Sequence, residues 1–224
     1  MLFEVSAIGG KMKGLIGKKV GMTQLYDETG KVTPVTVIQA GPCTVIDTMT
    51  DEGNGYSAVQ VGYGEKKAKN VSKALKGHCK KAGKDSNPPE IIKEFRTEKD
   101  EKLELGTVLT VDQFKANEFV DISGVTKGKG FQGVVRRYKF AGGRASHGGG
   151  WVRRPGSSGN RTWPAKVDRN KRRPGHMGSD SRTVQNLQVM RIDKEDNLLF
   201  VKGAVPGGNG GVLLVRPAKK KTSA

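Results

Sequence analysis

Short apolar runs separated by polar turns make up most of the chain outside residues 127–178. In residues 32–38 and 56–63, β-branched and aromatic residues alternate with polar ones, which is typical of a strand with one buried face. The predicted strands are residues 14–26, 32–38, 43–49, 56–63, 91–96, 107–111, 119–126, 183–192, 198–202 and 212–216. Their spacing is typical of antiparallel meanders and barrels. The pattern therefore predicts a mainly β fold built on an antiparallel β-barrel.

Residues 66–83 depart from the strand pattern. They are rich in lysine, and their apolar residues recur at near-helical spacing, which predicts a short helix packed on the barrel. The polar stretches at 27–30 and 51–55 predict turns. Residues 1–11 are expected to form a loose N-terminal extension without the basic start of a secretory signal, and residues 218–224 a basic tail.

Residues 127–178 interrupt the strands with a very different composition. They hold fourteen Lys or Arg against one acid, Asp168, and so carry thirteen of the chain's net eighteen positive charges. Glycine is frequent, and apolar surface is too scarce to offset the entropy of ordering the segment. Strands on both sides make it an insertion, so residues 12–126 and 179–217 are predicted to form one discontinuous barrel domain. The insertion is predicted to be a long extended loop without regular structure.

This charge distribution indicates a strongly anionic partner. A sequence pI near 10.0 is typical of proteins that bind nucleic acid or an anionic membrane surface. The longest apolar runs are far too short to span a membrane, and the dense glycine and proline of residues 127–178 disfavour an amphipathic helix. Nucleic acid is therefore the predicted partner, with no membrane and no small-molecule substrate.

Several motifs resemble catalytic ones but lack their context. Residues 128–133 match GxGxxG, yet no helix pattern follows them and no acid appears before Asp168, which argues against a dinucleotide or kinase site. His147 begins an HGGG run, but no GxSxG is present in the sequence. His147 and His176 have no neighbouring carboxylate in the sequence, which favours packing or RNA contact. We therefore predict that the chain is not an enzyme and needs no cofactor.

The two cysteines, Cys43 and Cys79, lie 36 positions apart without companion ligands at metal-binding spacing. Cys43 lies in an apolar run, which predicts a buried thiol. His78 beside Cys79 could suggest a metal or nucleophile, but no second ligand pair exists. The sequence thus predicts no metal site, and this cysteine usage fits a reducing cytoplasm.

Aromatic residues alternate with the basic ones through residues 127–178. Nine of the fourteen cations are Arg, which favours bidentate phosphate recognition. Trp151 and Trp163 lie among Arg, Gly and Pro, and aromatic faces of this kind stack on unpaired bases. For Phe131 and Phe140, packing against the protein's own barrel is an equally good interpretation.

Longer stretches resemble a known family. They are GLIGKKVGMTQLYDETGKVTPVTVI at 14–38, NGYSAVQVGYG at 54–64, GHCKKAG at 77–83, VTKGKGFQGVVRRYKF at 125–140, SHGGGWVRRPGSSG at 146–159, RPGHMG at 173–178 and NLLFVKGAVPGGNGGVLLVRPA at 197–218. In this order they resemble the L-three family of large-subunit ribosomal proteins, from residue 12 onward. Residues 1–11 have no counterpart in that resemblance.

The resemblance implies a translation-protein-type antiparallel β-barrel with a short helical segment and a long extended basic loop insertion. It implies a cytoplasmic structural component of the large ribosomal subunit that binds 23S rRNA near its 3′ end and acts early in assembly. The loop would run toward the peptidyl transferase centre without catalysing peptide transfer. Neighbouring proteins implied are the fourteenth and nineteenth of the bacterial large subunit. One alternative is a freestanding RNA-binding or RNA-chaperone protein on the same barrel. Another is an enzyme on a flavin-reductase-type barrel, but the sequence lacks the acid–base residues that such an enzyme would need.

The residues expected to bind rRNA combine the basic and aromatic positions of this loop with two lysines of the first strand. They are Lys18, Lys19, Lys127, Lys129, Arg136, Arg137, Arg144, His147, Trp151, Arg153, Arg154, Arg161, Trp163, Lys166, Arg169, Lys171, Arg172, Arg173 and His176. The loop tip is expected around residues 146–163, with Trp151, Arg153 and Arg154 deepest. Some family members carry a methylated glutamine near this tip; Thr162 stands at the matching position here, so that modification is not expected.

Overall fold

A computed structural model describes residues 13–26, 29–83, 87–97 and 103–221. The predicted extension at 1–11 and part of the turn predicted at 27–30 lie outside these residues. The chain forms two compact units. The body comprises the chain up to Val125 and from Arg182 onward, and the arm unit comprises Thr126–Ser181.

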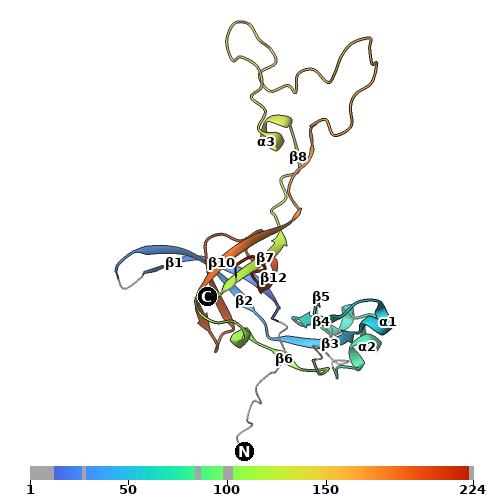
Figure 1. Ribbon diagram of the computed structural model, residues 1–224, viewed down its shortest axis with the longest axis vertical. Coiled ribbons are helices and arrows are strands. Elements are labelled where there is room, and N and C mark those ends of the chain that lie inside the picture. The colour runs from blue at the N-terminus through green and yellow to red at the C-terminus, as the bar shows by residue number, and fades with distance from the viewer. Residues whose placement is uncertain (1–12, 27–28, 84–86, 98–102, 222–224) are drawn as a thin grey trace, which may run out of the picture. The chain divides into compact units, whose positions relative to one another are not determined.

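Six antiparallel strands of the body pair in a cyclic order and form a closed barrel (Figure 1). Their order is β1 (Leu15–Tyr26), β12 (Val212–Pro217), β7 (Phe119–Val125), β10 (Ser181–Asp193), β11 (Leu198–Lys202) and β2 (Val32–Ala40). Alternate residues of β7, such as Val120 and Ile122, are completely buried. The period-two pattern thus places one face of β7 inside, as expected for a half-buried strand. The predicted mainly β fold is confirmed, while the translation-protein type of its barrel stays a prediction.

A second sheet accounts for four of the predicted strands. It has the order β5 (Ile91–Arg96), β4 (Ala58–Tyr63), β3 (Cys43–Met49) and β6 (Val108–Leu109). Val45, Val59 and Phe95 belong to the same buried cluster as the barrel residues Leu15 and Ile122. The predicted barrel thus accounts for only part of the predicted strands, because the alternation of a strand does not specify which sheet it joins. Of the strand predicted at 107–111, only Val108–Leu109 is extended; Val111–Gln113 forms a 3-10 helix, η2.

Short helices lie in the connections of the body. The turn predicted at 51–55 is a one-turn helix, α1 (Asp51–Asn54), which Gly55 ends at a φ of 75°. The helix predicted at 66–83 is split into a 3-10 helix, η1 (Ala68–Asn70), and α2 (Lys73–Lys80). The hydroxyl of Ser72 accepts the Leu75 backbone N–H and so caps α2. No helix in the described part of the chain is long and apolar enough to cross a membrane.

Helix α2 packs on the four-stranded sheet and not on the barrel as predicted. The Nε2 atom of His78 lies 2.7 Å from Oε1 of Gln60 in β4. The Nζ atom of Lys81 lies 3.9 Å from Oδ2 of Asp47 in β3. Cys79 is fully buried between these contacts. The helix therefore covers the face of the sheet that carries polar residues, which the apolar spacing alone could not indicate.

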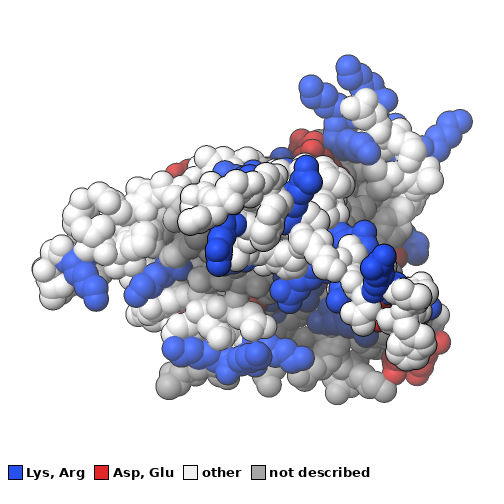
Figure 2. Space-filling model, turned by 90° about the horizontal axis from the view of Figure 1, so that it is seen from above, with Lys and Arg blue, Asp and Glu red and all other residues white. Residues whose placement is uncertain are grey.

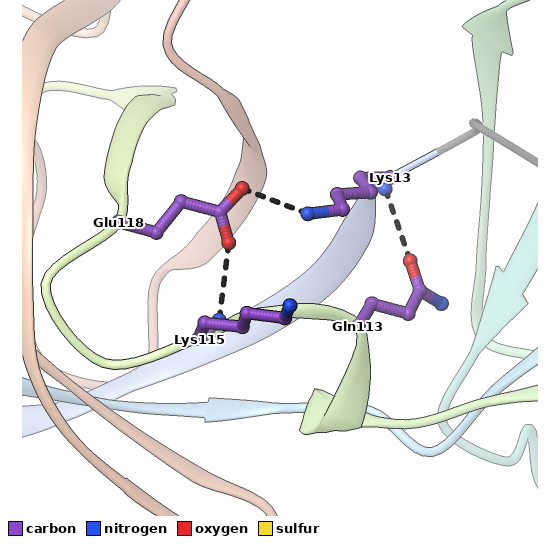
Figure 3. Close-up of polar contacts among 5 residues, drawn as sticks. Lys13, Gln113, Lys115 and Glu118 are labelled. Carbon is purple, nitrogen blue, oxygen red and sulfur yellow. Dashed lines mark hydrogen bonds and ion pairs between the residues drawn. The ribbon is translucent and has the colours of Figure 1, made fainter. Parts of the chain in front are cut away.

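Polar contacts fix the start of β1 against the chain that leads into β7 (Figure 3). The ammonium of Lys13 donates to Oε1 of Glu118 at 2.9 Å, and the other oxygen of Glu118 accepts the backbone N–H of Lys115 at 3.0 Å. Oε1 of Gln113 accepts the backbone N–H of Gly14. The ion pair is partly shielded, since the side chain of Glu118 is only 15% exposed. These bonds tie the residues just before β1 to the residues just before β7.

Cys43 is completely buried and forms no disulfide with Cys79, so both are free thiols. The predicted buried thiol at Cys43 is confirmed. Burial raises the pKa of the Cys43 thiol from 9.0 to about 11. Because the folded-state pKa is the higher one, this thiol's contribution to stability is complete below pH 9 and is lost as the pH rises through 11.

We therefore expect the free energy of unfolding to fall more between pH 8.5 and 11 in the wild type than in Cys43→Ala. The difference should be about 2–3 kcal/mol. Urea unfolding in reducing buffer at several pH values measures it, and lysine titration is common to both proteins. An equal decline in the two proteins would contradict the assignment.

Candidate nucleic-acid interface

The base of the arm unit is a two-stranded ladder. Strand β8 (Phe131–Gln132) pairs antiparallel with β9 (Gly175–His176). The backbone N–H of Lys129 donates to the Met177 carbonyl at 2.9 Å, and that of Met177 donates to Gly130 at 3.0 Å. The expectation that residues 127–178 lack regular structure is therefore wrong for both ends of the segment. Glycines leave room for these two backbones to approach, which composition alone did not reveal.

A single-turn helix, α3 (Val134–Tyr138), follows the ladder and is held by Arg137. The guanidinium of Arg137 donates to the Arg173 carbonyl at 2.9 Å and lies 5.0 Å from the ring centre of Tyr138. Arg172 approaches the same ring at 5.7 Å. Cation–π and charge-assisted contacts of this kind connect the outgoing and returning chains. Arg137 thus stabilises the arm unit itself, in addition to any role toward a ligand.

Gly178 is required at one close approach of the two chains. Its φ is +80°, and an added Cβ would lie 2.2 Å from the Lys127 carbonyl oxygen and 2.9 Å from the Gly128 Cα. Gly130 also has a positive φ, +66°, but an added Cβ there meets nothing within 4 Å. A Cβ at Gly178 therefore collides with backbone, whereas one at Gly130 costs only the unfavourable φ.

Gly178→Ala is expected to open the arm base, while Gly130→Ala should cost about 1 kcal/mol. Amide hydrogen exchange of Lys129 and Met177 in the free protein measures the effect. Exchange should accelerate much more in Gly178→Ala than in the Gly130→Ala control. Similar exchange in both variants would mean that the close approach does not hold the ladder together.

The two tryptophans of the arm unit lie in different surroundings. The ring of Trp151 packs on Gly143, where an added Cβ would lie 2.4 Å from Cε3, and Trp151 is 52% exposed. The backbone N–H of Gly143 donates to the Val152 carbonyl at 3.1 Å, which closes this part of the tip. Trp163 is 85% exposed and Phe131 is 76% exposed. Trp163 and Phe131 therefore offer free ring faces, whereas one face of Trp151 is already covered.

The cations of the arm unit are open to solvent and uncompensated. All of those predicted to bind rRNA are exposed except Arg137, which is partly buried. Among the described residues, no Lys or Arg of the arm unit takes part in an ion pair with a carboxylate. Figure 2 shows many basic and few acidic side chains on the face it presents. Such a surface attracts polyanions strongly.

The predicted site residues divide between the two units. Seventeen of the nineteen lie in the arm unit, including His147 and His176, which are both exposed. Lys18 and Lys19 lie in β1 of the body. Lys18 is paired with Glu90 at 3.1 Å. Lys19 is 7% exposed and its Nζ donates to the carbonyls of Val205 and Gly207. The ammonium groups of both lysines are therefore engaged by contacts within the body.

One arm cation was not in the predicted set. Lys139 ends α3 at a φ of 59° and is exposed. Its charge was visible in the sequence, but its left-handed backbone conformation was not. Local composition would have been the only signal for including it.

The arm unit thus presents exposed cations and free aromatic faces. Such a surface is typical of proteins that bind a polyanion. A family model described as Ribosomal protein L3 matches residues 86–199. The chain is 50% identical to the large ribosomal subunit protein uL3 of Pelobacter propionicus over 93% of its own length and 99% of that protein. It is 49% identical to the protein of the same name from Alkaliphilus metalliredigens, covering 94% and 99%, and 46% identical to that of Geobacter sulfurreducens, covering 93% and 98%. The chain belongs to the ribosomal protein L3 family.

Proposed function

We propose that this chain is a structural constituent of the large ribosomal subunit that binds 23S rRNA through its arm unit. The observation that carries the proposal is the set of exposed arm cations without carboxylate partners among the described residues. Family membership supports the ribosome as the setting. The role is structural and not enzymatic, and its place is the cytoplasm.

The arm residues have distinct roles in this proposal. The exposed arginines, such as Arg153 and Arg154, contact phosphates, since a guanidinium can pair bidentately with phosphate oxygens. Trp163 stacks on an unpaired base through its exposed ring. Trp151 shapes the tip by packing on Gly143 and presents its other face to the RNA. Lys18 and Lys19 serve the body, because their ammonium groups are already engaged.

The finer parts of the proposal rest on the family resemblance. The barrel is of the translation-protein type and binds near the 3′ end of 23S rRNA early in subunit assembly. The tip of the arm unit runs toward the peptidyl transferase centre. The fourteenth and nineteenth proteins of the large subunit are its neighbours.

Sedimentation of cell extracts at moderate salt tests the proposed function. The full chain is expected to move with large subunits, and early assembly predicts its presence in incomplete large-subunit particles as well. A chain found mostly free, or on RNA outside ribosomes, would instead be a freestanding RNA-binding or RNA-chaperone protein.

A further inference from the structure

The body carries a second basic surface, remote in sequence from the arm unit. Helix α2 exposes Lys73, Lys76 and Lys80 at positions i, i+3 and i+7, which lie on one face of a helix. We call these three residues the lysine stripe. The opposite face of α2 contains the buried Cys79 and His78, which contacts Gln60 of β4. The stripe therefore points away from the sheet.

No acid is available within the segment to balance the stripe. Residues 66–83 contain seven lysines and no Asp or Glu. On the sheet face below, both oxygens of Glu94 already accept hydrogen bonds, from Tyr56 and from Gln60. Asp47 is opposite Lys81. Within the described ranges, no ion pair involves a lysine of the stripe.

Like charges at this spacing disfavour the helix. Lys73 with Lys76 and Lys76 with Lys80 make two such pairs. Tertiary anchoring holds α2 in place despite this cost, through the contact of His78 with Gln60 and the Ser72 cap. A bound polyanion would remove the repulsion.

We propose that the lysine stripe is a second RNA-contact surface, which binds the phosphate backbone of a duplex RNA segment independently of the arm unit. The inference rests on the proposed function, since it takes RNA as the partner. Segment 66–83 has no aromatic residue, so it has nothing to stack on unpaired bases. Lysines alone recognise phosphate charge, and duplex RNA is bound chiefly through its shape and backbone.

The dimensions of the stripe suit such a backbone. Lys80 lies seven positions after Lys73, which corresponds to about 10 Å along a helix axis. A nucleic-acid duplex carries one charge for about every 1.7 Å of its axis, so roughly six phosphates fall within that length. Three lysine side chains can therefore each reach a separate phosphate.

The test compares the full chain with a Lys73→Gln, Lys76→Gln, Lys80→Gln variant in binding to a duplex-containing fragment of large-subunit rRNA. Gln keeps the helix propensity close to that of Lys, and circular dichroism checks the fold. The slope of log K against log salt concentration should become shallower by about two to three units. The charge-matched control, Lys31→Gln, Lys115→Gln, Lys202→Gln, removes three exposed lysines elsewhere on the body and should change the slope by less than one.

The outcomes separate this inference from the proposed function. A wild type that does not bind rRNA defeats the proposed function itself. If the wild type binds but the stripe variant and the control have equal slopes, only the inference fails. Amine-reactive labelling of assembled large subunits gives a second readout, in which the stripe should be protected relative to Lys31, Lys115 and Lys202. Protection with an unchanged slope on RNA would overturn the inference in favour of an acidic protein partner.

Discussion

Replacing Arg144, Arg153, Arg154 and Arg161 with Gln is expected to weaken binding of the full chain to large-subunit rRNA by on the order of a hundredfold at physiological salt. All four are exposed residues of the arm unit and have no carboxylate partner among the described residues. Their charges are thus available for phosphates and do not hold the protein together. The slope of log K against log salt concentration should become shallower by about three to four units.

Binding titrations over a salt series measure both quantities. A variant with Lys31, Lys93, Lys115 and Lys202 changed to Gln has the same net charge, but its substitutions lie on the body. It should keep most of the affinity and of the slope. If the arm variant kept the wild-type slope, these arginines would not contact phosphate.

Trp163→Ala is expected to weaken rRNA binding without changing the salt dependence. Stacking of a base on an aromatic side chain contributes about 1–3 kcal/mol, which corresponds to roughly fivefold to more than a hundredfold in affinity. With 85% of the residue exposed, the ring has little packing to lose within the protein. Trp163→Phe keeps a stacking face and should retain most of the binding. Equal affinity of Trp163→Ala and wild type would place the ring away from any base.

Trp151→Ala serves as the contrasting variant, because its ring is partly used inside the arm unit. Loss of the contact with Gly143 should speed amide exchange of Gly143, whose N–H donates to the Val152 carbonyl, in the free protein. Trp163→Ala should leave that exchange unchanged. The two tryptophans are thus distinguished by a measurement made without RNA.

The strands were the best-predicted part of the fold, because a half-buried strand imposes a period of two on its own residues. The ranges 43–49 and 91–96 agree with β3 and β5. Sheet membership was not predictable in the same way. Whether β3 joins the barrel or the second sheet depends on pairing with Ala58–Tyr63 and Val108–Leu109, and alternation does not encode the partner.

The basic composition of residues 127–178 identified the candidate interface. It did not show which of these side chains make contacts within the protein and which are free to bind RNA. Arg137 and Arg153 are equivalent by composition, yet Arg137 bonds the Arg173 carbonyl and Arg153 is exposed. Similarly, the environment of Trp151 depends on Gly143, eight residues earlier. These contacts depend on a backbone path that local sequence does not determine. The contacts of Lys19 were not predictable either. Its charge suggested a contact with a ligand, but its ammonium donates to the carbonyls of Val205 and Gly207.

The ladder between β8 and β9 has a consequence for the kinetics of assembly. The ladder joins the chain at Phe131 and His176, so only the residues between them remain to be ordered when RNA binds. The entropic cost of bringing the two ends of this segment together has already been met in the free protein. Once the body has bound, the tip is held at a high effective concentration near its own site. Its insertion becomes a unimolecular step, whose rate should not depend on the concentration of free protein.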